Sequence, residues 1–288
     1  MLEAVKRSTA AAVDLGTRKF WRATGRPIDL DGEEYWLRAP TAGPGRVGAA
    51  WLEAEAARRG GHVHHALPGA GLIGDWAQLA GPGFDPAALH PAIDDFYRHT
   101  ANWRMEVWSS WSPQFRPGDE LVTRGFGKRV QQLALPLDPL EVSRGLDGTV
   151  SVLTDSTGTQ VAAGWIRTLR LTGDVVFSGC YTTRTLPGAD RPSVHVTFPL
   201  EAGNLQVFLR PHNRAGGALE LSSPPGRWGA DGAYVAVRDA GRDHAKRVPL
   251  HESFRLYVDD EQVLRTDHVL RFGRATALRL HYRLTRRE

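Results

Sequence analysis

The chain has 288 residues, 41% of them hydrophobic, and a net charge of +4. No apolar run approaches the roughly 18 residues that a membrane-spanning helix needs, and residues 1–21 lack the continuous apolar stretch of a signal peptide. We therefore expect a cytoplasmic protein with no membrane span. A single cysteine, Cys180, excludes an internal disulfide and a cysteine-based zinc site, and it is predicted to be a small buried residue.

The charge pattern gives little support to nucleic-acid binding, although the pI is near 9.4. The 36 basic residues are spread along the chain and interleaved with 32 acidic ones. A surface that follows a phosphate backbone needs its basic residues on one face. We therefore expect no nucleic-acid partner.

Residues 1–118 are predicted to form a helical, loop-rich N-terminal part. Helices are expected over 1–25, ending near Gly25, and over 49–59, where the pattern is amphipathic. Long connections rich in Gly and Pro separate the helices. Such connections are long for a compact domain, so we expect them to lie on the surface of a larger body.

The third predicted helix spans 91–111 and holds many of the aromatic side chains. Pro91 suits its first position, where a missing N–H costs nothing. Large apolar residues recur along it at helical spacing: Phe96, Trp103, Val107 and Trp111. Tyr97 and Trp108 widen this stripe. A stripe so aromatic must be covered, so we expect the helix to pack on a sheet.

Residues 119–288 are predicted to form an antiparallel β part that makes one compact unit with the first part. Short alternating runs are separated by hairpin-like turns such as DSTG, EAGN and DDEQ. The predicted strands lie over 130–135, 148–154, 160–171, 174–186, 193–199, 204–210, 218–222, 232–239, 246–258, 263–272 and 275–284. The expected fold class is α+β, with a large curved, mostly antiparallel or barrel-like sheet on which the aromatic helical part packs.

Three motifs that suggest nucleotide or phosphoryl chemistry lack the context that this chemistry needs. Residues 43–48 and 69–74 match G-x-G-x-x-G, but neither follows a buried parallel strand or precedes an acidic residue at the required distance. Residues 155–159 resemble the phosphorylated-aspartate motif of cation pumps, with Ser156 in place of the lysine, and a hairpin turn explains them. We expect no cofactor.

Three histidines, His62, His64 and His65, are candidate metal ligands. Alternation would place His62 and His64 on one side of an extended segment. No carboxylate or cysteine lies nearby and no H-E-x-x-H motif is present, so we expect a surface loop and no metal.

The last two predicted strands each have one apolar face, and the two faces coincide if a three-residue loop, 273–275, joins the strands. Thr266 then lies opposite Tyr282, and His268 lies opposite Leu280. In this register His268 and Tyr282 are diagonal neighbours within side-chain reach.

The preceding strand would add His251, Arg255 and Tyr257 to the same face if its turn had an even-numbered loop. The simplest interpretation of His268 is a core histidine whose hydrogen bonds are satisfied. The alternative is a polar cluster at the bottom of an apolar cavity.

Several long, ordered blocks stand out in the sequence: LHPAIDDFYRHT, WSSWSPQF, KRVQQLALPLDPLEVSRGLDG, GWIRTLRLTG, TFPLEAGNLQVFLRP and LRTDHVLRF with LRLHYR. Together, from about Gly69 to Arg283, they resemble the soluble C-terminal region of the YndJ-like bacterial proteins. Other members of that family carry a membrane-embedded portion ahead of this region, whereas the residues before Gly69 have soluble character here. The resemblance implies no activity. It implies that characteristic blocks contain Trp108, Trp111, Arg210, Asp267 and His268.

We expect cofactor-independent chemistry on a hydrophobic small molecule, such as a cyclisation or isomerisation of the kind found in natural-product biosynthesis. Inward aromatic rings and a few polar groups are what an apolar pocket offers for such chemistry. The residues predicted to act as acids, bases or hydrogen-bond donors are His268, Tyr282 and Tyr181. The residues predicted to contact the substrate are Trp103, Trp108, Trp111, Arg210 and Tyr97. The alternative is a non-catalytic carrier or sensor of a lipid-like ligand.

Overall fold

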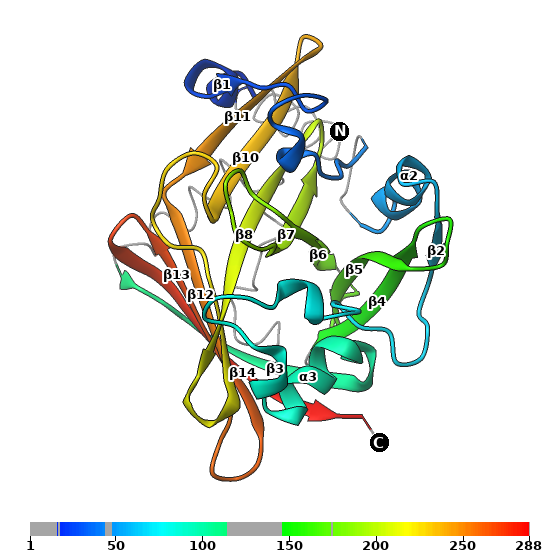
Figure 1. The fold of residues 1–288 in the computed structure, drawn as a ribbon, viewed down its shortest axis with the longest axis vertical. Coiled ribbons are helices and arrows are strands. Elements are labelled where there is room, and N and C mark those ends of the chain that lie inside the picture. Colours follow the sequence, from blue (N-terminus) through cyan, green and yellow to red (C-terminus); the bar gives the residue numbers. More distant parts are fainter. Residues whose placement is uncertain (1–15, 17, 44–47, 114–145, 174, 288) are drawn as a thin grey trace.

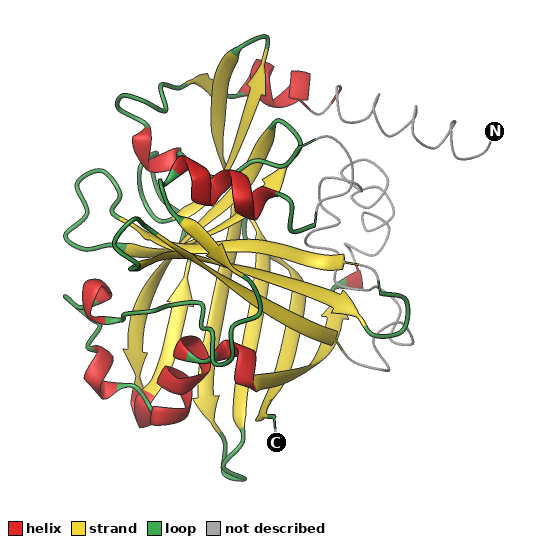
Figure 2. Cartoon of the chain, turned by 90° about the vertical axis from the view of Figure 1, so that its right-hand side faces the viewer, coloured by secondary structure: helices red, strands yellow, loops and turns green. Residues whose placement is uncertain are grey.

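The computed structural model describes residues 16, 18–43, 48–113, 146–173 and 175–287. About half of these residues belong to a large antiparallel sheet, with short helices at one end and along one side (Figures 1 and 2). The predicted antiparallel architecture is confirmed. The sheet is open rather than closed into a barrel, because no ladder between described residues joins the two ends of its strand order, β2 (His62–His64) and β3 (Trp103–Trp111).

Successive hairpins build most of the sheet, in the order β2-β4-β5-β6-β7-β8-β9-β12-β13-β14-β3. The other strands are β1 (Arg26–Pro27), β4 (Leu146–Thr154), β5 (Gln160–Leu169), β6 (Val175–Arg184), β7 (Ser193–Leu200), β8 (Gly203–Arg214), β9 (Ala218–Ser222), β10 (Gly232–Asp239), β11 (Arg242–Val248), β12 (Leu250–Val258), β13 (Leu264–Phe272) and β14 (Ala275–Arg286). The strand predicted over 130–135 lies outside the described residues. The strand predicted over 246–258 is wrong as a single element. Pro249, which has no N–H to donate, separates β11 from β12.

The long strand β8 divides the sheet into two leaves. Its residues 203–208 pair with β10, and its residues 210–214 pair with β9. One leaf therefore holds β4 to β8 with β10 and β11, and the other holds β9, β12, β13, β14 and β3. The main apolar core takes side chains from both leaves, including Val196 and Val207 from the first and Leu256 from the second. We call this space between the leaves the interior.

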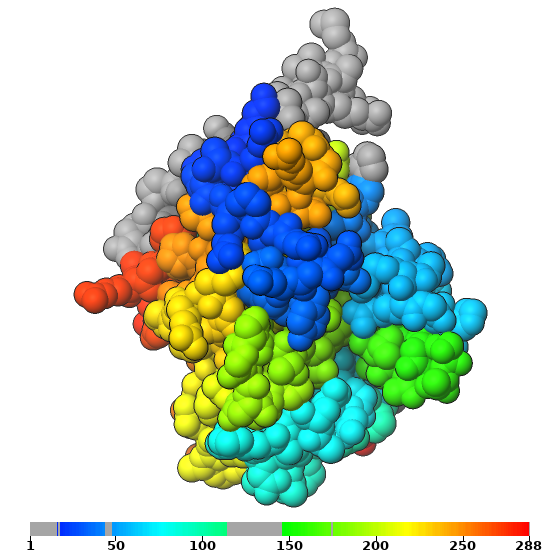
Figure 3. Space-filling view, turned by 45° about the horizontal axis from the view of Figure 1, so that its top comes forward, coloured from blue at the N-terminus to red at the C-terminus, as the bar shows by residue number. Residues whose placement is uncertain are grey.

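Two N-terminal segments cover the outside of the first leaf. Helix α2 (Trp51–Arg58), close to its predicted bounds, packs on β4, β5 and β6. A Cβ atom at Gly164 of β5 would lie 2.4 Å from Leu52 Cδ2, so glycine permits this close packing. The segment around Trp36 packs on Phe208 and Tyr234, and Figure 3 shows this blue segment against the orange strands. Described residues 16 and 18–24 are helical up to Gly25, as predicted.

The predicted helix over 91–111 is wrong beyond its first two turns. Helix α3 (Pro91–Arg98) begins as expected, with His90 Nδ1 accepting a hydrogen bond from the Ala92 N–H at 3.2 Å. A short 3₁₀ turn follows, and then strand β3 pairs with β14. Trp103, Val107 and Trp111 are four residues apart, a spacing that fits one helix face and also one strand face. The additional inward residue Met105 shows the strand period of two.

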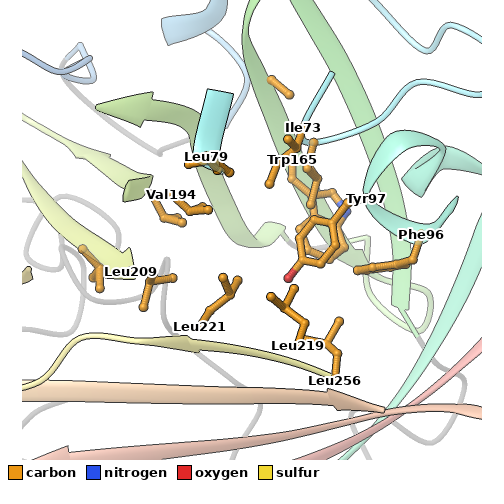
Figure 4. Packing of buried hydrophobic residues seen from close by; sticks show 14 of the residues in the cluster. Ile73, Leu79, Phe96, Tyr97, Trp165, Val194, Leu209, Leu219, Leu221 and Leu256 are labelled. Atoms are coloured by element: carbon orange, nitrogen blue, oxygen red, sulfur yellow. The ribbon is translucent and has the colours of Figure 1, made fainter. Parts of the chain in front are cut away.

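Helix α3 and the segment before it close one end of the interior (Figure 1). Ile93, Phe96 and Tyr97 on α3 are buried, and Trp76 packs edge-on against Tyr97 at 5.1 Å between ring centroids. Figure 4 shows the Tyr97 ring extending among the apolar side chains of both leaves. The short 3₁₀ turns lie at Tyr35–Leu37, Ala77–Leu79, Pro86–Ala88, Thr100–Asn102 and Ala215–Gly217.

Candidate functional site

Polar side chains from five strands and α3 face the apolar interior. We call this set the interior polar cluster: Tyr97, Arg167, Tyr181, Glu252, His268 and Tyr282. Burial is the main cause of the pKa shifts of Tyr97, Tyr181, Glu252, His268 and Tyr282, and the charge of Arg167 acts on all of these except Glu252. Four of the sequence-predicted site residues, Tyr97, Tyr181, His268 and Tyr282, are therefore brought together.

The hairpin formed by β13 and β14 positions two members of the cluster. Thr266 pairs with Tyr282 and His268 pairs with Leu280, so the predicted register is confirmed. The predicted three-residue loop is wrong, because Phe272 already pairs with Ala275. A register shift next to Leu270 adds one residue to β14, and this bulge restores the even register that the longer loop was expected to supply.

Glu252 and His268 form the most unusual part of the cluster. Glu252 Oε2 lies 3.8 Å from His268 Nε2, and the imidazole stacks on Phe254 with 3.8 Å between ring centroids. Burial raises the pKa of Glu252 to about 7. Burial, with the charge of Arg167, lowers the pKa of His268 to about 3. At neutral pH the imidazole is therefore uncharged, and Glu252 is close to the midpoint of its titration.

His268 differs from a core histidine with a structural role. Neither of its ring nitrogens, both buried, has a hydrogen-bond partner. His195 is 1% exposed, and its Nδ1 lies 3.0 Å from Thr182 Oγ1 while its Nε2 lies 2.9 Å from Gln206 Oε1. A buried polar atom without a partner is costly, so the free nitrogens of His268 mark a place where an added molecule would gain hydrogen bonds.

The three tyrosines supply neutral hydroxyl groups around this pair. Burial raises the pKa of Tyr97, Tyr181 and Tyr282, so all three remain protonated at neutral pH. Arg167 lies close enough to the Tyr282 hydroxyl to oppose this rise by its charge and by hydrogen bonding. A protonated phenol can donate a hydrogen bond to an oxygen that gains negative charge during a reaction.

A pocket lies beside Trp103, and Arg167 is the member of the interior polar cluster that lines it. The pocket is also lined by apolar side chains of α3, β3 and β5. Its empty volume is about 350 Å³, a value that includes the space open to solvent. Trp103 Nε1 donates to Asp95 Oδ2 at 2.9 Å, which fixes the indole at the edge of the pocket. Trp103, predicted from the sequence to contact a substrate, lines this pocket from strand β3 rather than from a helix.

Several other predicted site residues lie away from the cluster. Trp108 is on the outer face of β3 and 53% exposed, and its ring lies 6.0 Å from that of His281. Arg210 also faces outward and pairs with Asp190 at 2.6 Å. Trp111 packs with the apolar residues of β14 near one end of the second leaf. Neither Trp108 nor Arg210 can contact a ligand in the interior.

The condition under which the preceding strand would add His251, Arg255 and Tyr257 to the inner face is not met. The turn between β12 and β13 has five residues, 259–263, because Val258 pairs with Leu264. His251, Arg255 and Tyr257 therefore alternate to the outer face, and Glu252 takes an inward position.

Sequence reasoning missed Glu252 and Arg167, although both left a signal. In LHESFRLYV the inward series is Leu250, Glu252, Phe254 and Leu256, in which one acid interrupts an apolar face. In GWIRTL the residue two after Trp165 on the same face is Arg167. A single charged residue on an otherwise apolar strand face was the available signal in both strands.

The rejected motifs have structural roles where they are described. Gly71 lies against the Arg98 carbonyl, where a Cβ atom would approach to 2.1 Å. Asp155 Oδ1 accepts hydrogen bonds from the Thr157 and Thr159 N–H groups in the hairpin turn that the sequence predicted. Residues 44–47 of the other glycine motif lie outside the described residues.

The predicted surface loop at the three histidines is wrong, because His62 and His64 lie on β2. His65 contacts Ser151 and Glu53. In the described part of the chain, no group of three or more His, Cys, Asp or Glu side chains is placed to hold a metal ion.

The fold and the cluster define an open antiparallel β-sheet protein whose interior holds an acid, an imidazole and several phenols. No protein-family model matches the chain, and searches of curated proteins and of solved structures found no match. The resemblance to the YndJ-like proteins therefore depends on the sequence blocks alone. Among the residues that the structure describes, no helix has the length and apolar character needed to cross a membrane.

Proposed function

We propose that the protein catalyses a cofactor-independent proton transfer on a hydrophobic carbonyl compound, of the isomerisation type. The observation that supports this proposal is the buried pair of Glu252 and His268, in which the imidazole has no partner within the protein. A general acid–base works best with a pKa near the working pH, and the pKa of Glu252 is about 7.

In the proposed reaction, the Glu252 carboxylate removes a proton from the carbon next to the carbonyl group. The C–H electron pair moves into the new C=C bond, and the carbonyl oxygen gains negative charge. Glu252 then returns the proton to another carbon of the conjugated system, so that the product is an isomer of the substrate. Neither an oxidant nor a cofactor is needed for this step.

The other members of the cluster stabilise the charge that develops on the oxygen. Tyr181 and Tyr282 donate their hydroxyl protons as hydrogen bonds. His268 is uncharged at neutral pH, so it can donate one N–H without protonating the enolate. We place the substrate's route from solvent at the pocket that Arg167 lines.

Exchange of carbon-bound protons with D₂O tests this proposal without knowledge of the natural substrate. A panel of hydrophobic ketones and enones is incubated with the protein, and loss of the α-proton signal is followed by ¹H NMR. We expect exchange above the buffer rate with the wild type and at least tenfold slower exchange with Glu252→Gln, which cannot accept the proton.

The outer face of the hairpin formed by β13 and β14 provides a matched control. His281 Nδ1 lies 2.8 Å from Asp267 Oδ1, so this acid–imidazole pair has similar chemistry but faces away from the interior. Asp267→Asn should exchange protons at the wild-type rate. Equal rates for the wild type and Glu252→Gln would contradict the proposal. A ligand that co-purifies with the protein in native mass spectrometry, and whose carbon-bound protons do not exchange with D₂O, would instead support a carrier.

A further inference from the structure

Arg167 carries a positive charge inside the protein that the described residues do not neutralise. The residue is only 8% exposed. Its guanidinium lies 3.7 Å from the Trp165 ring centroid and 4.5 Å from that of Phe177. No ion pair joins it to a carboxylate in the described part of the chain, and its buried Nε has no hydrogen-bond partner.

Another buried arginine, Arg191, also has an Nε without a partner, but its terminal nitrogens are satisfied by the protein. Arg191 is 4% exposed, and its terminal nitrogens donate to the Leu79 carbonyl at 2.9 Å and to the Pro211 carbonyl at 2.8 Å. Arg167 has aromatic faces and a phenol around it instead of carbonyl acceptors. Burying a charge without a partner is costly, so the position of Arg167 indicates an anion that is supplied from outside the chain.

The surroundings of Arg167 define the kind of anion. The pocket it lines has apolar walls from Phe96, Trp103, Met105 and Trp165. Asp147, another lining residue, is already paired with Arg170 at 2.6 Å. Arg287, which also lines the pocket, is exposed, and its Nη2 donates to the Gly148 carbonyl at 3.5 Å. The guanidinium of Arg167 is the buried one, and its edge can bind a carboxylate through two parallel hydrogen bonds.

We propose that Arg167 binds the carboxylate of a hydrophobic carboxylic acid whose apolar part lies against Trp103, Met105 and Trp165. This inference depends on the proposed function in one respect, because it narrows the substrate of that reaction to compounds with a carboxylate.

Calorimetric titration with matched pairs of small molecules tests the proposal. The probes are octanoate with octanamide and 3-phenylpropanoate with its primary amide, which share an apolar part and differ in charge. The wild type should bind each carboxylate at least tenfold more tightly than its amide. Arg167→Met should lose this preference, and Arg167→Lys should retain part of it, because lysine keeps the charge but not the paired donors.

Two controls keep the result interpretable. Arg283→Met removes an arginine from the outer face of β14 and should leave the preference unchanged. The melting midpoint of Arg167→Met should be no lower than that of the wild type, because the change removes an unpaired buried charge. Equal affinity for acids and amides, a preference that survives in Arg167→Met, or a large fall in its melting midpoint would each overturn the proposal.

The two proposals can fail separately. Carboxylate binding through Arg167 with no proton exchange on any ketone would keep the anion site and reject the enzymatic reaction. Exchange on neutral ketones without selective carboxylate binding would keep the reaction and reject the anion site.

Discussion

Glu252 and His268 are diagonal neighbours on β12 and β13, with 3.8 Å between the carboxylate oxygen and the imidazole nitrogen. Burial moves their pKa values in opposite directions, to about 7 for Glu252 and to about 3 for His268. Both shifts disfavour the charged form, so each residue lowers the stability of the folded state in the pH range where it would carry charge.

Glu252→Gln should stabilise the protein at alkaline pH. The pKa of Glu252 is higher in the folded state than its ordinary value of 4.5, so the wild type loses stability as the pH rises from about 4.5 to 7. The whole effect is roughly 3 kcal/mol. Urea unfolding at pH 5 and pH 8 measures it, and the stability of the variant relative to the wild type should increase between the two. An identical difference at both pH values would disagree with a buried, neutral Glu252.

His268→Leu and His195→Leu should have opposite effects on stability at pH 8. His195→Leu leaves Gln206 and Thr182 without their partner and should cost about 1–3 kcal/mol. His268→Leu removes two buried nitrogens that have no partner, so it should be neutral or stabilising. Thermal melting of the two variants gives the comparison. A loss for His268→Leu as large as that for His195→Leu would show that the imidazole is satisfied by the protein.

Trp103→Ala and Trp108→Ala test the assignment of β3 as a strand. Trp103 faces the interior and packs on Phe96, with 5.9 Å between ring centroids, so its truncation should cost roughly 2–3 kcal/mol. Trp108 lies on the outer face, so its truncation should cost less than about 0.5 kcal/mol. Denaturant unfolding distinguishes the two, and similar losses would place both residues on one helix face.

Cys180 should resist thiol reagents in the native protein. Cys180 lies on β6 and packs against α2, and burial raises the pKa of its thiol to about 12. The thiolate is the reactive form, so native protein should react far more slowly than protein in denaturant. A colorimetric thiol assay in buffer and in urea compares the two rates. Fast reaction in buffer would indicate that α2 leaves the sheet readily.

The sequence predicted the sheet well because each strand pairs mainly with its neighbour in the chain. Alternating residues and turn sequences report such local pairing, and they placed most described strands near their observed bounds. The β3 prediction failed because its partner, β14, is far along the chain. Spacing alone did not separate helix from strand there.

Part of the candidate site was also accessible from the sequence. The pairing of His268 with Leu280 followed from matching two apolar faces with an assumed three-residue loop. The pairing is correct because the bulge in β14 offsets the shorter loop. The inward positions of Glu252 and Arg167 could be predicted only with the register between neighbouring strands. For Glu252 that register depends on the five-residue turn before β13, whose length the composition does not show. Burial, which sets the pKa of Glu252, depends on both leaves together.

The pairing of β3 with β14 has a consequence for the synthesis of the chain. Residues 103–111 leave the ribosome long before residues 275–286 are made. Until then, the tryptophan-rich strand has an unpaired backbone edge, and Met105 and Val107 lack the β14 side chains on which they pack. Such edges promote association between nascent chains, so slowing translation near the end of the message should lower the yield of correctly folded protein more than slowing it near the start.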